Sequence, residues 1–161
     1  LYSHKNSSGA VDTLILKNVT NDSYSYGLIT SAKSNGNSSK YDILSEGNRY
    51  SISIRGKFSV SYGDAVKISG NIMSPDTMNS LSSVSGRATS VLSDKITVNN
   101  NVYKLSDKVT VYKRNSSASS EYTMLSTDDL IKNPSKYTYT LYYDDTTSGA
   151  ERVRVILVTE V

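Results

Sequence analysis

The feature that most constrains this chain is an alternation of side chains with a period of two. Residues 137–143 read YTYTLYY, so one face of an extended chain carries three tyrosines and a leucine: Tyr137, Tyr139, Leu141 and Tyr143. An amphipathic helix needs a period of about 3.6 residues and cannot produce this pattern. Residues 137–143 therefore predict a β-strand.

Short runs of the same kind recur along the chain, each rich in β-branched or aromatic residues and bounded by Gly, Asn or Ser. They lie at residues 11–17, 26–32, 49–54, 65–72, 95–98, 102–105, 108–112 and 151–159. Turn formers separate them, such as Ser45-Glu46-Gly47-Asn48 and the three asparagines at 99–101. We expect an all-β fold of small antiparallel barrel-like or sandwich-like modules.

Only one helix is expected. Ser126 and Asp129 have the spacing of a capping box, in which the two side chains bond to each other's backbone amides. The helix should cover residues 127–132 and end at Asn133, because a residue that precedes proline resists helical geometry.

Serine- and asparagine-rich stretches divide the predicted strands. Residues 33–39 and 115–120 are interpreted as exposed loops, and residues 74–85 as the region of a domain boundary. The sequence thus predicts a first β-module at residues 1–80 and a second at residues 81–161.

Two internal matches favour a duplication. Residues 27–31 (GLITS) match residues 86–90 (GRATS), and the N-x-Y triplet at residues 48–50 matches the triplet at 101–103. Both pairs occur in the same order. The alternative is that antiparallel sheets simply reuse the same turn residues.

A third match joins the two ends of the chain. Residues 1–10 (LYSHKNSSGA) align without a gap to residues 141–150 (LYYDDTTSGA), and each is followed by an apolar run. Residues 1–17 are therefore interpreted as the closing hairpin of a preceding unit, or else as the first strand of the present fold. On this interpretation His4 lies in a polar turn.

Catalytic chemistry has little support in the sequence. The chain has no cysteine and a single histidine, His4, so a zinc or copper site and a Ser-His-Asp triad both lack their residues. We expect no cofactor and no enzymatic activity. The net charge of +3 comes from scattered residues, which argues against nucleic acid as a partner, and no apolar run is long enough for membrane insertion.

Two groups of residues remain as weak candidates for ligand binding. Asp144 and Asp145 are turn formers that could also ligate calcium, although no calcium-loop motif surrounds them. The side chains of Tyr137, Tyr139, Tyr142 and Tyr143 could stack on sugar rings, but cross-strand packing is the more common role of such a stripe. An oligonucleotide-binding barrel has the right size, but the chain lacks the basic density that phosphates require.

Residues 9–32 and 95–158 carry a resemblance to a known group of proteins, in phrases such as KITVNNNVYKLSDKVTVY, STDDLI and RVRVILV. They are similar to the β-rich regions that accompany S-layer homology domains in cell-surface proteins of clostridia and other Firmicutes. The resemblance implies export, an extracellular or cell-surface location in a Gram-positive bacterium, and membership of a longer modular chain. It implies no catalytic residues, and the helical wall-binding domain itself is not in this segment.

These observations predict a non-catalytic structural module, serving as a spacer or in assembly, in a bacterial cell-surface protein associated with the S-layer and cell wall. Its partners would be neighbouring modules of the same polypeptide or components of the cell wall. The alternative is a carbohydrate-binding module for cell-wall or host glycans that uses the tyrosine-lined face.

Overall fold

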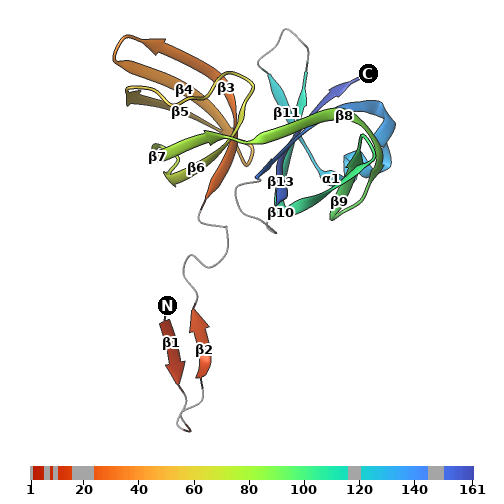
Figure 1. Ribbon diagram of the computed structural model, residues 1–161, viewed down its shortest axis with the longest axis horizontal. Helices are drawn as coiled ribbons and strands as arrows, with labels where there is room; N and C mark the ends of the chain where they lie inside the picture. Colours follow the sequence, from red (N-terminus) through yellow and green to blue (C-terminus); the bar gives the residue numbers. More distant parts are fainter. Residues whose placement is uncertain (1, 6–7, 9–10, 16–23, 116–120, 145–150) are drawn as a thin grey trace.

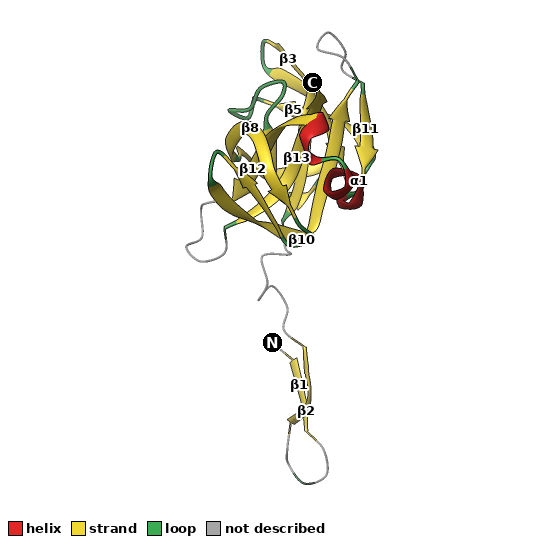
Figure 2. Cartoon of the chain, turned by 90° about the vertical axis from the view of Figure 1, so that its right-hand side faces the viewer, coloured by secondary structure: helices red, strands yellow, loops and turns green. Residues whose placement is uncertain are grey.

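Thirteen β-strands and two short helices make up the part of the chain that the structure describes, residues 2–5, 8, 11–15, 24–115, 121–144 and 151–161. The structure is a computed structural model. Its strands form a two-stranded hairpin, a five-stranded sheet and a barrel (Figure 1; Figure 2). The all-β class expected from the period-two pattern is confirmed.

The N-terminal hairpin pairs β1 (Tyr2–Lys5) with β2 (Val11–Ile15) in antiparallel fashion. His4 pairs with Thr13 and so lies within β1. The expectation that His4 occupies a polar turn is wrong, because the backbone up to Lys5 pairs with β2 and the turn comes later, at Ser8. The expectation that residues 11–17 contain a paired strand is confirmed for Val11–Ile15, whereas Lys17 lies outside the described residues.

The five-stranded sheet is antiparallel throughout. It contains β3 (Ser25–Asn35), β4 (Ser38–Ser45), β5 (Asn48–Arg55), β6 (Ala65–Asn71) and β7 (Ser74–Ser80). The strands lie side by side in the order β5-β4-β3-β6-β7, which leaves β5 and β7 at its two edges.

The barrel uses the second half of the chain. Its strands are β8 (Ser82–Val91), β9 (Lys95–Val98), β10 (Asn101–Arg114), β12 (Tyr137–Asp144) and β13 (Arg152–Glu160). The order is β10-β13-β12-β8-β9, and β9 also pairs with β10, which closes the ring. β10 and β13 are parallel, while a short β11 (Tyr122–Leu125) extends the sheet beside β10.

The chain passes from the five-stranded sheet to the barrel at a single residue, Leu81, between β7 and β8. The serine-rich region at 74–85, where the sequence predicts a domain boundary, therefore consists of β-strand before and after Leu81. The sequence pattern does not predict β7, because Met78 is the one residue of this strand that is buried.

The turns follow the backbone preferences of their residues. Glu46-Gly47 and Asn99-Asn100 adopt positive φ values in the hairpins where the sequence predicts turns. The interpretation of residues 33–39 as a loop is wrong: β3 continues to Asn35, and Gly36, with φ of 59°, begins a tight turn into β4. Most of the second expected loop, residues 116–120, lies outside the described residues.

The predicted helix is confirmed as α1 (Thr127–Lys132), with Ser126 as N-cap and both capping-box bonds to Asp129 present. It ends at Asn133, and a 3₁₀ turn (Pro134–Lys136) leads into β12. α1 carries one buried side chain, Leu130, which packs into the barrel core.

Each sheet encloses its own apolar core. The barrel core consists of buried residues from all five barrel strands and α1: Val91, Ile96, Val98, Leu105, Val111, Leu130, Tyr137, Tyr139, Leu141, Val153, Ile156 and Val158. The core of the five-stranded sheet consists of Ile29, Tyr41, Ile43, Ile52, Val60, Val66, Ile68 and Met78.

Candidate functional site

The most extensive cluster outside these two cores is the place where the five-stranded sheet meets the barrel, which we call the junction. Its centre is a third apolar cluster with three buried residues from each side: Leu28, Leu44 and Ala65 from the sheet, and Tyr112, Tyr142 and Val155 from the barrel. Alternation places these barrel residues outward, because their strand neighbours Val111, Leu141 and Ile156 face the barrel core.

Tyrosine hydroxyls bind the backbone across the junction. Tyr142 donates to the carbonyl of Gly63 at 2.9 Å, and the Gly47 N–H donates to the Tyr112 hydroxyl at 3.2 Å. Burial raises the pKa of both hydroxyls, so both remain neutral and retain their protons. Each tyrosine thus fills apolar space with its ring and satisfies a polar group of the other sheet.

A buried ion pair lies beside this cluster. The Lys67 ammonium on β6 is 2.7 Å from a carboxylate oxygen of Asp144 at the end of β12. The Asp144 side chain is 2% exposed and also accepts a hydrogen bond from the Tyr26 hydroxyl at 3.2 Å. Lys67 further lies over the ring of Tyr24, 4.1 Å from its centroid.

The ion pair bears on the two residues that the sequence offers as calcium ligands, Asp144 and Asp145. The Asp144 carboxylate is held by an ammonium group, and Asp145 lies outside the described residues. Within the described ranges, no group of three or more His, Cys, Asp or Glu side chains is placed to hold a metal ion.

Arg154 on β13 is a further charged residue buried at the junction. Its guanidinium lies over the ring of Tyr26 at 4.7 Å and donates from Nη1 to Ser106 Oγ at 2.9 Å. Burial raises the pKa of Tyr26 to about 12, although the positive charge of Arg154 acts in the opposite direction.

A more exposed contact marks the rim of the junction. Arg114 on β10 donates to the hydroxyl of Tyr62, which precedes β6, and its guanidinium lies 5.7 Å from the centroid of the Tyr62 ring. Tyr122 on β11 also donates to the Tyr62 hydroxyl, at 3.4 Å. These hydrogen bonds, that of Tyr122 first, lower the pKa of Tyr62.

The tyrosine stripe of β12 divides between the barrel core and the junction. Tyr137, Tyr139 and Tyr143 all pack in or against the barrel core, as the predicted shared face requires, while Tyr142 points to the junction. Tyr139 is fully buried and donates to the carbonyl of Pro134 at 2.8 Å. Of the four, only Tyr143 is half-buried and has surface to offer a ligand.

Tyr143 lines a pocket of about 410 Å³ at one end of the barrel. Its ring pairs with that of Tyr103 on β10, with 5.7 Å between centroids and a tilt of 41°. The other lining side chains are Val102, Lys104, Glu151, Arg152 and Val153. An aromatic pair beside charged hydrogen-bonding groups is a suitable surface for a sugar.

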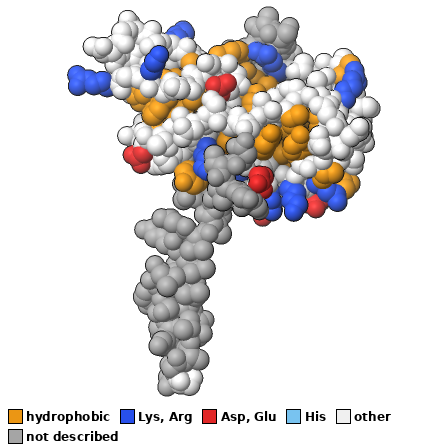
Figure 3. Space-filling view, viewed as in Figure 1, with side chains coloured by type: hydrophobic (Ala, Val, Ile, Leu, Met, Phe, Trp, Pro, Cys, Tyr) orange, Lys and Arg blue, Asp and Glu red, His pale blue; other side chains and the backbone are white. Residues whose placement is uncertain are grey.

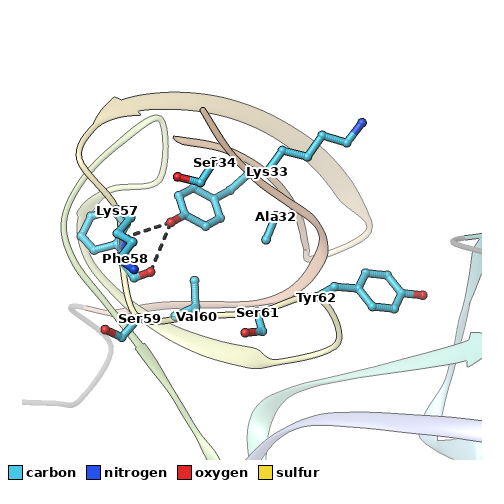
Figure 4. Close-up of a pocket in the computed structure, with 10 residues that line it drawn as sticks. Ala32, Lys33, Ser34, Lys57, Phe58, Ser59, Val60, Ser61 and Tyr62 are labelled. Atoms are coloured by element: carbon cyan, nitrogen blue, oxygen red, sulfur yellow. Dashed lines mark hydrogen bonds between the residues drawn. The ribbon is translucent and has the colours of Figure 1, made fainter. Parts of the chain in front are cut away.

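A second pocket, of about 500 Å³, lies between β3 and the segment that joins β5 to β6. Tyr41 forms its wall, donating to the Phe58 carbonyl at 3.2 Å and accepting from the Phe58 N–H at 3.0 Å. Figure 4 shows Ala32 and Val60 pointing into this pocket, while the amine of Lys33 and the ring of Tyr62 point away. Its lining combines apolar side chains with the serines at positions 34, 59 and 61.

The basic residues on the surface are scattered, as the sequence suggests. Figure 3 shows lysine and arginine side chains spread around the visible face and not gathered into one stripe. In the described part of the chain, no helix is long and apolar enough to cross a membrane.

Comparisons with known proteins give no relative. No protein family, no curated protein and no solved structure matches this chain.

Sequence reasoning missed the residues that build the junction. Lys67 lies in the apolar strand AVKISGN and Arg154 in the apolar strand RVRVILV. A charged residue inside an otherwise buried strand requires a partner, and that signal was present in both strands. What the sequence could not provide was the partner, since Lys67 and Asp144 are far apart along the chain.

Proposed function

We propose that this chain is a non-catalytic structural module, a spacer or assembly element of a bacterial cell-surface protein associated with the S-layer. The resemblance to β-rich regions beside S-layer homology domains supports an extracellular location at a Gram-positive cell wall. The observation that carries the structural role is the junction between the sheet and the barrel.

The junction favours a fixed orientation of the two sheets. Domains that share a small polar interface move relative to each other by default. Here six buried residues form an apolar cluster, and the Lys67–Asp144 pair and two tyrosine hydroxyls bind across it. Because a pivot would separate a buried ion pair, the two sheets should act as one rigid segment, as a spacer requires.

The strand orders support tandem modules at residues 1–80 and 81–161. Numbered along the chain, the strands of the first sheet lie in the order 3-2-1-4-5. The barrel strands β8, β9, β10, β12 and β13 have the same order when the ring is opened between β10 and β13. The matched G-x-x-T-S phrases lie in the first strand of each, and the matched N-x-Y triplets begin the third.

The shared glycine of these phrases has the same physical role in both sheets. A Cβ at Gly27 would lie 2.7 Å from Ile43 Cγ2 on β4. A Cβ at Gly86 would meet the Asn99 side chain first and would also lie 2.9 Å from Val98 Cγ1 on β9. In each case a side chain of the second strand occupies the space beside the first. A common packing constraint at matched positions supports duplication over reuse of turn residues.

The N-terminal hairpin supports a further copy. Tyr2 pairs with Ile15 in β1–β2, and Tyr142 pairs with Val155 in β12–β13. Tyr142 lies 140 positions after Tyr2, and Val155 lies 140 positions after Ile15; the same offset aligns residues 1–10 with 141–150. Residues 1–17 are thus interpreted as the closing hairpin of a preceding unit.

Spin-label distances test the rigid spacer, and the absence of cysteine makes the labelling clean. Labels on Ser53→Cys and Lys95→Cys, both exposed, span the junction, while labels on Lys95→Cys and Lys132→Cys stay within the barrel. We expect equally narrow distance distributions for the two pairs. Asp144→Asn should broaden only the pair that spans the junction. A much broader distribution across the junction of the unaltered protein would overturn the rigid role.

The location requires a separate test. Antibodies against the module should label intact cells of the bacterium that produces it as strongly as permeabilised cells. Labelling that depends on permeabilisation would contradict the surface assignment.

The pocket of Tyr103 and Tyr143 favours a second candidate, a carbohydrate-binding module for cell-wall or host glycans. Small five-stranded barrels are used by proteins that bind oligosaccharides. A glycan array should then give hits that Tyr103→Ala removes and that Tyr62→Ala, on the other side of the junction, retains. An array without hits would leave the spacer as the only candidate.

A further inference from the structure

A defect in strand pairing surrounds Arg154. On β13, Val153 pairs with Leu105 of β10 and Val155 pairs with Thr110, so residues 106–109 of β10 bulge out opposite Arg154. The pairing with β12 also skips this residue, because Tyr143 pairs with Val153 and Tyr142 with Val155. Arg154 therefore has no ladder partner on either neighbouring strand. Bulges of this kind redirect a side chain and often occur beside functional sites.

The bulge borders a cavity of about 150 Å³ at the junction. Since a water molecule occupies about 30 Å³ in the liquid, this volume admits a small organic group. The lining residues that matter here come from both sheets: Tyr26, Glu46, Ser106, Lys108, Thr110 and Arg154.

The guanidinium of Arg154 is buried with part of its hydrogen-bonding capacity unused. Arg154 is 8% exposed, and Nη1 donates to Ser106. The Nε N–H is buried and has no acceptor in the described parts of the chain. A buried donor without a partner is rare in native proteins and indicates a missing water, ion or ligand. The edge of a guanidinium that carries Nε and Nη2 is one that binds a carboxylate through two parallel hydrogen bonds.

The charges and hydroxyls around the cavity agree with an anion. Lys108 adds a second positive charge. Among the described residues Glu46 is the one acidic residue that lines the cavity, so this part of the lining carries two positive charges against one negative. Ser106 and Thr110 are buried and add hydroxyl groups. Both Lys108 and Glu46 are exposed, so they surround the entrance while Arg154 lies at depth.

We propose that this cavity binds the carboxylate group of a small organic acid, with Arg154 as its main partner and Lys108 as a second positive charge. The carboxylate accepts from the guanidinium of Arg154. Glu46 weakens binding by repulsion and so limits affinity. A bound carboxylate would also stabilise the junction, because the cavity is lined by both sheets.

Proton–nitrogen correlation spectra of the intact chain test this directly, because arginine Nε–H groups give their own signals. The Arg154 signal is assigned by its loss in Arg154→Lys. The probes are sodium glucuronate and sodium acetate, with glucose and sodium chloride as matched neutral and ionic controls. We expect the Arg154 Nε–H signal to shift with glucuronate and to stay unchanged with glucose and chloride. A shift with acetate as well assigns the site to carboxylates in general, and a shift with glucuronate alone assigns it to acidic sugars.

Two exposed variants make the test independent of Arg154, whose replacement could unfold the junction. Lys108→Gln should weaken glucuronate binding roughly three- to tenfold, and Glu46→Gln should strengthen it by a similar factor. The proposal is overturned if no carboxylate shifts the Arg154 signal, which would leave water as the partner of Nε. It is equally overturned if neither variant changes the affinity.

Discussion

At the scale of single residues, Lys67 and Asp144 show how far burial changes the meaning of a charge. Asp144 occurs in the sequence as half of an acidic pair at a turn, which suggests a turn former or a cation ligand. In the fold it is the buried partner of an ammonium group from the other sheet. No local pattern could reveal this, because the partner comes from a strand of a different sheet.

Removal of one partner should therefore be costly. Asp144→Asn is expected to lower the free energy of unfolding by about 3–5 kcal/mol, because it removes one charge of an ion pair whose carboxylate is buried at the junction. The double variant Lys67→Met/Asp144→Leu should recover most of this loss, since it removes both charges of the pair. Urea unfolding followed by circular dichroism measures both. Lys136→Met breaks an exposed pair with Glu160 and should have little effect. An Asp144→Asn variant as stable as the parent would show that the pair contributes nothing.

The buried tyrosines predict sensitivity to alkali. Burial raises the pKa of Tyr26 and of Tyr139 to about 12, from an ordinary value of 10.0. The folded protein therefore holds these protons more tightly than the unfolded chain. Their contribution to stability is complete below pH 10 and is lost as the pH rises through about 12.

Unfolding free energies measured between pH 8 and pH 12 should thus fall above about pH 10. Tyr139→Phe removes one of these groups and should give a shallower decline over the same interval. Equal slopes for the parent and the variant would show that Tyr139 does not titrate with unfolding.

At the scale of elements, the sequence predicts best where the determining interactions are local. The capping box of Ser126 and Asp129 defines α1 because both partners lie within one turn. The asparagines at 99 and 100 define a hairpin because they tolerate positive φ. Prediction fails where a distant partner decides. β11 has no buried residue and exists because β10 pairs with it, and β10 is one strand because β9 and β13 pair with its two halves.

The turn between β9 and β10 can be tested at Asn100, which has φ of 65°. Asn100→Ala should lower the free energy of unfolding by about 1 kcal/mol, because a Cβ without a polar side chain is disfavoured in this conformation. Asn100→Gly is the matched control and should be neutral or slightly stabilising. Thermal melts compare the two. Equal melting temperatures for the alanine and glycine variants would mean that the turn does not depend on this conformation.

At the scale of the whole molecule, the two sheets have separate cores and one shared interface. The barrel is closed and has its own apolar core, whereas its outward residues Tyr112, Tyr142 and Val155 form a cluster with residues of the other sheet. The sequence could indicate the crossing near residue 80 from its composition. The sequence could not indicate the junction, because alternation shows that one face of a strand is buried but does not show which other element packs on that face.

Expression of residues 81–161 alone tests this division. The fragment should fold, because the barrel needs no strand from the first sheet, and it should retain the far-ultraviolet signal of a β-protein. It should melt well below the intact chain, since the apolar cluster becomes exposed and the ion pair of Asp144 with Lys67 is lost. A fragment without cooperative unfolding would show that the barrel is not an independent unit.

The parallel pairing of β10 with β13 also determines when each sheet can form during synthesis. In the first sheet every hydrogen-bonded neighbour has been made once Ser80 is complete, so this sheet can assemble while later residues are still being added. The barrel has to wait, because its last strand is inserted between two earlier ones, β10 and β12. Until then both of these strands expose an unpaired edge, and the finished first sheet offers Leu28, Leu44 and Ala65 as the surface against which they can be held. During synthesis the second half of the chain therefore needs protection from aggregation for longer than the first.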